Sequence, residues 1–332
     1  MIPKPLSAGL PAARNARLAA GVFVFALAAL LQGCAALIPQ SSALRDARPA
    51  GIPERIELAD VPFFPQTEYQ CGPAALATVL AHGKATVTPD ALVSQVYVPE
   101  RKGSLQVEML AAARRHGMVS YVLLPRMEDM LREIAAGNPV IVLQDLGIWP
   151  ITEQWHYAVA VGYDLVEGEL ILRSGERKRQ VLPLGVHEYV WRRSDYWAMV
   201  AVPPGRIPAT ADEATWLAAV AAFERVDARG ARTAYAALLD RWPGNVEAMI
   251  GLANARHAAG ELKGAEAALR GALARRPDSV VVLNNLAQTL SDQGRHAEAL
   301  PFAERAVAAG GPFAAAARQT RDLVRARMAR KP

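Results

Sequence analysis

The sequence predicts an α+β domain followed by an all-α domain of helical repeats. In its first half, helical patterns come before extended apolar runs, an order typical of α+β domains. In its second half, strand patterns stop after Pro203-Pro204-Gly205, alanine becomes frequent, and residues recur with a period of 34. The length of 332 residues and the 52% hydrophobic content suit about two globular domains.

Helical periodicity marks four segments of the first half, roughly residues 71–81, 89–96, 104–116 and 127–136. Glycines follow three of them, where C-terminal caps belong: Gly83, Gly117 and Gly137. Five extended runs come next, at residues 139–146, 156–164, 169–174, 179–184 and 196–202. Gly168 indicates a hairpin between the second and the third run. The tryptophans of this half are expected to pack in the strand core, with room for one of them to line the cleft: Trp149, Trp155, Trp191 and Trp197.

The second half contains pairs of identical residues 34 positions apart: Gly260 and Gly294, Ala265 and Ala299, Ala272 and Ala306, Pro243 and Pro277. Residues 246–279 and 280–310 resemble the tetratricopeptide repeat family, in which each repeat is a pair of antiparallel helices. A divergent copy precedes them around residues 231–243, and a helix at 314–328 is expected to cap the array. The resemblance implies a module that binds a protein partner.

The first helices of these repeats are expected to form a concave groove. Its predicted residues are polar and nearly neutral in total charge: Glu247, Asn254, His257, Asn284, Gln288 and Asp292. Such a groove favours an internal or helical segment of a partner, bound through hydrogen bonds and tolerant of salt.

The N-terminus carries Arg14 and Arg17 before an apolar run of 14 residues, 18–31, which is short for a membrane span but suits a signal peptide. Leu31-Gln32-Gly33-Cys34 resembles the bacterial lipobox, which implies lipidation of Cys34 and a membrane anchor. Residue 36 is Ala, so the resemblance implies the outer membrane, facing the periplasm. An ordinary signal peptide or anchor with a chance cysteine is the alternative.

These observations predict four segments: a lipoprotein signal peptide at 1–33, a tether at 34–55, an α+β domain at 56–204 and a repeat domain at 209–330. The net charge of +5 comes largely from the two ends of the chain, without a basic stripe and interleaved aromatics. That distribution argues against nucleic acid as a partner.

Cys71 is the only cysteine besides Cys34, and it stands beside Gly72 and Pro73 where a helix should begin. A thiol near the N-cap faces the positive end of the helix dipole, which lowers its pKa and favours the nucleophilic thiolate. Such a nucleophile needs a base. Among the six histidines, only His156 opens a predicted strand. A buried, inert cysteine is the alternative for Cys71.

The segments FFPQTEYQCGPAALATVL and HYAVAVGYD, about 85 residues apart, resemble the papain-like cysteine peptidases of the bacteriocin-leader-processing type, peptidase family thirty-nine. The resemblance covers roughly residues 61–202 and is strongest to free-standing relatives. It implies a papain-like domain with Cys71 as the nucleophile and His156 as the base. Gln66 would be the oxyanion glutamine.

Two positions depart from the family pattern. Gln66 stands five residues before the cysteine, where six is common, and Gln70 is a weaker substitute. Ser174 stands where the family has an Asp or Asn that orients the histidine. A serine can accept the imidazole N–H but adds no negative charge. Asp164 and Asp145 are the other candidates for this third role.

The sequence therefore predicts an envelope-anchored cysteine peptidase that hydrolyses peptide bonds and binds a protein through its repeats. An acyl or amide transferase that uses the same thiol is one alternative. A degenerate peptidase domain that serves as a scaffold is the other. No metal-ligand spacing and no nucleotide-binding glycine pattern is found, so we expect no cofactor.

Overall fold

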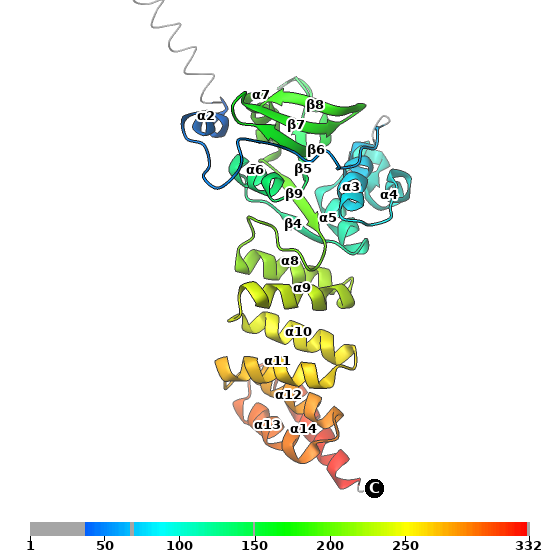
Figure 1. The fold of residues 1–332 in the computed structure, drawn as a ribbon. Helices are drawn as coiled ribbons and strands as arrows, with labels where there is room; N and C mark the ends of the chain where they lie inside the picture. Colours follow the sequence, from blue (N-terminus) through cyan, green and yellow to red (C-terminus); the bar gives the residue numbers. More distant parts are fainter. Residues whose placement is uncertain (1–36, 67–69, 149, 331–332) are drawn as a thin grey trace, which may run out of the picture.

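The computed structural model describes residues 37–66, 70–148 and 150–330 of the chain (Figure 1). It confirms the predicted fold class, because an α+β domain with an antiparallel sheet is followed by a series of helices. The predicted signal peptide and Cys34 lie outside the described residues. Within the described part of the chain, none of the helices has the length and apolar character needed to cross a membrane.

The central sheet has seven strands, and its neighbours run in the order β4-β9-β5-β6-β7-β8, with β1 beside β6. All the paired strands are antiparallel. Its strands are β1 (Arg55–Glu57), β4 (Val119–Val122), β5 (Val140–Asp145), β6 (Trp155–Asp164), β7 (Glu169–Ser174), β8 (Arg177–Pro183) and β9 (Ala198–Val202). A separate pair consists of β2 (Tyr97–Val98) and β3 (Gly103–Ser104).

Helices cover both faces of this sheet. One face packs against α3 (Cys71–His82), α4 (Pro89–Val96) and α5 (Gln106–Arg115). The other packs against α6 (Met127–Ala135) and α7 (Leu184–Trp191). The period of two in β6 explains the arrangement, since Tyr157 and Val159 face α3 while Ala158 and Ala160 face the opposite core.

Part of the segment expected to be a tether is folded onto the domain. Helix α2 (Pro39–Asp46) packs against α6 and α7. The buried carboxylate of Glu188 accepts hydrogen bonds from the backbone N–H groups of Gln40 (2.8 Å) and Ser41 (2.6 Å), and from the Ser41 hydroxyl (2.6 Å). A carboxylate at a helix N-terminus satisfies free N–H groups and complements the helix dipole, so α2 is fixed in place.

Among the tryptophans expected in the strand core, Trp155 is an exception. Trp191 is fully buried and Trp197 is partly buried, but Trp155 is exposed at the first position of β6. Trp149 lies outside the described residues.

The helical half confirms the repeat prediction. It contains α8 (Glu213–Glu224), α9 (Ala228–Arg241), α10 (Val246–Ala258), α11 (Leu262–Arg275), α12 (Val280–Asp292), α13 (His296–Ala309) and α14 (Ala314–Ala329). The alanines found by the period of 34 are fully buried between helices: Ala265, Ala272, Ala299 and Ala306. Gly260 and Gly294 end the first helix of each pair with φ of 77° and 79°, a conformation that glycine adopts without strain.

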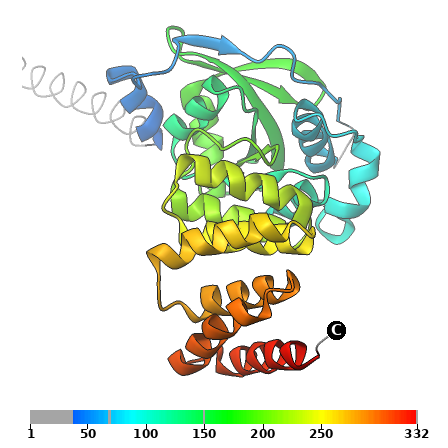
Figure 2. The same cartoon turned by 60° about the horizontal axis from the view of Figure 1, so that its bottom comes forward.

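The first repeat helix also belongs to the core of the α+β domain. Trp216 and Phe223 of α8 are buried in the same cluster as residues of β4 and β9. The Tyr121 ring lies edge-on to Trp216 with 6.0 Å between centroids, and its hydroxyl is 3.1 Å from Thr215 Oγ1. The remaining helices follow one another away from the sheet toward the C-terminus (Figures 1 and 2).

Candidate active site

Cys71 is the first residue of α3, one position later than the N-cap expected from the sequence, which is occupied by Gln70. It is a partly buried free thiol. Gly72 follows it because α3 approaches β3 closely at this point. A Cβ on Gly72 would lie 2.6 Å from the Cβ of Ser104, a distance that real side chains do not reach. The Cys-Gly pair therefore reflects the packing of the helix start.

His156 lies at the second position of β6, and its imidazole contacts the end of β7. The Nε2 atom is 2.9 Å from the hydroxyl oxygen of Ser174, the last residue of that strand. Ser174 is almost completely buried. The structure therefore pairs His156 with the serine found at the position of the missing carboxylate.

The thiol lies beside the same strand. The backbone of Tyr157 hydrogen-bonds to Cys71, so the sulfur contacts β6 at the residue next to His156. The Tyr157 hydroxyl in turn donates to the carbonyl oxygen of Ser104 (3.2 Å). Among the described residues, no direct hydrogen bond joins Cys71 to His156. No sequence pattern pointed to Tyr157, because its contribution comes from the backbone.

Gln66 approaches the site from the loop before α3. Its backbone N–H donates to the carbonyl oxygen of Gly175 (3.2 Å), the residue that follows Ser174. Gln66 is partly buried, and residues 67–69 between it and Gln70 lie outside the described part of the chain. The loop thus holds Gln66 at the turn between β7 and β8, next to the His156 and Ser174 pair.

Burial dominates the electrostatics of the site. It raises the pKa of the Cys71 thiol above the ordinary value, although hydrogen bonds from the backbone of Tyr157, Gly72 and Cys71 act in the opposite direction. Burial also lowers the pKa of His156 to about 4. The expected lowering of the thiol pKa by the helix dipole is therefore wrong, since desolvation outweighs it. At neutral pH the pair consists of a thiol and a neutral imidazole.

The two other candidates for the third role lie elsewhere. Asp164 is at the opposite end of β6, where it accepts from the backbone of Val166 (2.9 Å) and pairs with Arg55 (2.8 Å). Asp145 is the buried last residue of β5, where it accepts hydrogen bonds from the backbone of Gly147 and Gln154. Although burial raises the Asp145 pKa, these bonds lower it overall. Both carboxylates hold turns.

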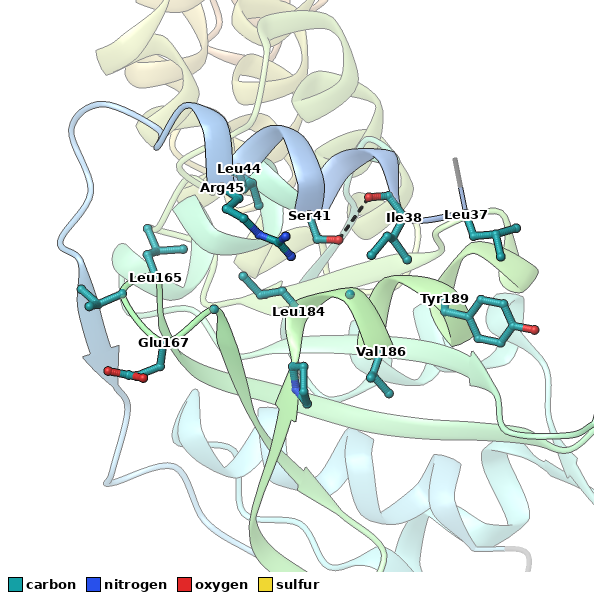
Figure 3. Close-up of a pocket in the computed structure, with 14 residues that line it drawn as sticks. Leu37, Ile38, Ser41, Leu44, Arg45, Leu165, Glu167, Leu184, Val186 and Tyr189 are labelled. Carbon is teal, nitrogen blue, oxygen red and sulfur yellow. Dashed lines mark hydrogen bonds between the residues drawn. The ribbon is translucent and has the colours of Figure 1, made fainter. Parts of the chain in front are cut away.

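A cavity of about 700 Å³ lies on a different part of the domain (Figure 3). It runs between α2, α7 and the loop from β6 to β7, with Leu37 and Tyr189 at one end and Leu165 and Glu167 at the other. No residue of the thiol site lines it. Within residues 37–66, 70–148 and 150–330, no cluster of His, Cys, Asp and Glu is arranged to hold a metal ion.

The repeats carry a smaller cavity of about 200 Å³, lined by Asn254, His257, Asn285, Gln288 and Thr289 among others. Three of these belong to the predicted groove, but Asn285 takes the place expected for Asn284. Asp292 does not point freely into the groove, because it contacts His257 (2.8 Å) and Arg327 of α14 (2.6 Å). The capping helix thus adds a cation that the sequence pattern did not indicate.

Comparison with known proteins supports both halves of this description. Residues 58–195 match the model of the Peptidase_C39 like family, and residues 222–279 and 280–309 match tetratricopeptide repeat models. A crystal structure of a candidate C39-like peptidase from Bacillus anthracis is similar at 16% identity and a TM-score of 0.39, covering 45% of this chain and 98% of that one. A search of curated proteins finds no match. The chain therefore carries a peptidase C39-like domain followed by tetratricopeptide repeats.

Proposed function

We propose that this protein is a cysteine peptidase in which Cys71 is the nucleophile and His156 the base. The observation that carries the proposal is the convergence at the end of β7: the imidazole bonds Ser174 Oγ at 2.9 Å, and the thiol bonds the backbone of the residue after His156. This arrangement occurs within the segment that matches a peptidase family.

The proposed reaction starts from a neutral pair. As the Cys71 sulfur attacks the carbonyl carbon of a peptide, His156 takes the thiol proton and then gives it to the leaving amine. The backbone N–H of Cys71 and the side chain of Gln66 would stabilise the oxyanion. Water, deprotonated by His156, then attacks the thioester; the C–S bond breaks, the acid is released, and the Cys71 sulfur takes the proton back from the imidazolium.

Ser174 sets an expectation for the rate. It holds the imidazole through a hydrogen bond but cannot stabilise the imidazolium by charge. In serine proteases, loss of the triad carboxylate costs up to about 10⁴ in kcat. We therefore expect slow turnover unless a bound substrate excludes water and brings the pair together.

One observation favours a second function. The thiol pKa is raised, the His156 pKa is lowered to about 4, and no carboxylate bonds the imidazole in the described part of the chain. These features also suit a scaffold that keeps the peptidase fold and binds peptides without cleaving them.

A peptide library separates the two functions. Wild type, Cys71→Ala and His156→Ala are incubated with peptides from a digested proteome, and new termini are identified by mass spectrometry. The peptidase proposal expects new termini from wild type alone. New termini that also appear with Cys71→Ala would indicate a contaminating protease. If wild type produces no new termini, the scaffold function is favoured.

The anchor and the partner complete the proposal. We infer from the sequence that Cys34 is lipidated and holds the domain on the envelope membrane, and Cys34→Ala tests this inference. That variant should lose the lipid mass and leave the membrane fraction, whereas an unmodified wild-type N-terminus would overturn the inference. Tetratricopeptide repeats bind proteins, so α8–α14 would bring a substrate or partner to the domain.

A further inference from the structure

Four exposed apolar side chains gather around the cavity between α2 and α7 (Figure 3). Leu37 is 42% exposed, Val166 46%, Val186 50% and Tyr189 37%, and all four line this cavity. They come from three parts of the chain: the segment before α2, the turn between β6 and β7, and α7. Single apolar residues on a surface need no explanation, but a cluster that the fold assembles from separate segments marks an interaction surface.

The segment before α2 is fixed to this surface. Arg192 donates a hydrogen bond to the carbonyl oxygen of Leu37 (2.9 Å). A Cβ on Gly185, the second residue of α7, would lie 2.8 Å from Cδ1 of Ile38, so the start of α7 packs closely against this segment. Glu188 binds the N-terminus of α2 at the same place. These contacts hold the first described residue beside the cavity.

The position of Leu37 in the sequence identifies the partner. Cys34, the proposed site of lipidation, stands three residues before it, and three residues span at most about 11 Å. A lipid on Cys34 would therefore keep the cavity and its apolar side chains next to the headgroups of the bilayer. Because α2 is folded onto the domain, the anchor would orient the domain as well as retain it.

The chemistry of the surface suits a membrane. Tyrosine is typical of the membrane–water interface, since its ring is apolar and its hydroxyl stays hydrated. Arg45 lines the same cavity and is exposed, where it can approach anionic phospholipid headgroups. Glu167 lies at the other end of the cavity and pairs with Arg55 (3.6 Å), which offsets its charge. Apolar area and attraction to anionic lipid together set the strength of interfacial binding.

We propose that the surface formed by Leu37, Val166, Val186 and Tyr189 docks on the phospholipid bilayer to which Cys34 is attached. The proposal rests on the anchor proposed above and adds an orientation to it. Helices α2 and α7 lie at the end of the α+β domain away from the repeats (Figure 1). Docking through this surface therefore directs α8–α14 away from the membrane, toward a soluble partner.

Photo-crosslinking in the full chain tests the docking. A benzophenone amino acid replaces Val186 or, as the matched control, Val107, a 64% exposed valine of α5. The protein is mixed with vesicles of phosphatidylethanolamine and phosphatidylglycerol and irradiated. Mass spectrometry should find phospholipid attached to residue 186 and none attached to residue 107.

A loss of apolar area should weaken the docking. Leu37→Ser combined with Val166→Ser should lower the ratio of docked to undocked protein about ten-fold, as measured by phospholipid attachment at residue 186. The reason is that burial of each half-exposed apolar side chain is worth about a factor of three to ten.

Each outcome decides the proposal. No phospholipid at residue 186, or equal attachment at residues 186 and 107, would overturn it. Attachment of residue 186 to a second copy of the chain would also overturn it and assign the surface to a dimer. Intact mass separates the docking from the anchor. Phospholipid at residue 186 with an unmodified Cys34 would reject the anchor and leave the docking surface standing, whereas a lipidated Cys34 without phospholipid at residue 186 would reject the docking alone.

Discussion

The imidazole of His156 is partly buried and has a hydroxyl as its hydrogen-bond partner, 2.9 Å away. Burial lowers the His156 pKa to about 4 because the charged ring would lose its hydration, and Ser174 supplies no charge in return. Burial has the opposite effect on the Cys71 thiol and raises its pKa. Both shifts favour the neutral pair and oppose the ion pair.

Replacing Ser174 with Asp should reverse this balance. A carboxylate within reach of the ring should raise the His156 pKa by about one to three pH units, because it stabilises the imidazolium. NMR titration of the imidazole measures the shift, and the rate of Cys71 alkylation at neutral pH should rise with it. Ser174→Asn is the neutral control. An unchanged His156 pKa in the Asp variant would show that residue 174 does not act on the ring.

His187 provides a pH test of stability away from the thiol site. It is fully buried, its Nδ1 is 2.9 Å from Gln144 Nε2, and burial lowers its pKa to about 3. In the unfolded chain a histidine binds a proton below about pH 6.5, whereas the folded one stays neutral. The free energy of unfolding should therefore fall as the pH drops from about 6.5 toward about 3, by about 1.4 kcal/mol per pH unit for this one group.

Urea unfolding of wild type and His187→Gln at several pH values checks this expectation. The variant keeps a side chain that can bond Gln144 but removes the titrating ring. Its free energy of unfolding should depend less on pH between about 6 and 4. Equal slopes for the two proteins would contradict the assignment of a neutral buried imidazole.

At the scale of elements, two glycines in the repeats give a matched pair. A Cβ on Gly251 of α10 would lie 2.6 Å from Cε2 of the Tyr235 ring, while one on Gly271 of α11 would meet only Met249 Sδ at 3.6 Å. Alanine favours a helix over glycine by about 1 kcal/mol. Gly271→Ala should therefore stabilise the protein. Gly251→Ala should destabilise it by about 1 to 3 kcal/mol, because the ring must move.

Thermal unfolding of both variants measures the difference. A rise in Tm with Gly271→Ala and a fall with Gly251→Ala are expected. A rise with both would mean that α9 and α10 are less tightly packed than the contact with Tyr235 indicates.

The sequence predicted the elements whose ends carry capping residues or turn glycines. Helix α4 matches the predicted 89–96 and β7 matches 169–174, because capping residues and turn glycines define their ends. It missed β4, β1, α2 and α7, which have between three and eight residues and depend on tertiary contacts. Helix α7 holds buried Glu188, whose partners are backbone groups of α2, and no sequence pattern reveals such a pairing.

The same distinction applies to the candidate site. The Cys-Gly-Pro motif and the strand-opening histidine pointed to Cys71 and His156, and the resemblance to the family pattern pointed to Ser174. The protonation of the pair was predicted wrongly, because the degree of burial around α3 depends on packing with β3 and β6. The cavity beside α2 had no recognisable pattern, since its lining comes from three separate segments of the chain.

At the scale of the whole molecule, the two halves share one hydrophobic core. Val119 and Val200 of the sheet belong to the same buried cluster as Trp216 of α8 and Tyr235 of α9. The Glu133 carboxylate of α6 also accepts from the backbone N–H of Thr210 (2.7 Å), just before α8. The sheet domain and the first repeat helices are therefore expected to unfold together.

Trp216→Ala tests this coupling. Loss of a fully buried tryptophan should cost about 3 to 5 kcal/mol and should shift the near-UV signal and the helical signal to the same lower denaturant concentration. Val226→Ala, at an exposed valine beyond α8, should have an effect within about 0.5 kcal/mol. Two separate transitions, with only the helical one affected, would contradict a shared core.

The reaction of Cys71 with a peptidyl acyloxymethyl ketone tests the central proposal most directly. This reagent needs a thiol, a proton-transferring base and oxyanion stabilisation, whereas iodoacetamide at alkaline pH needs the thiol alone. Intact mass should show that the ketone labels Cys71 in wild type but not in His156→Ala, while iodoacetamide alkylates both proteins. Equal ketone labelling of the two proteins, or none of wild type, would contradict a catalytic Cys71 and His156 pair.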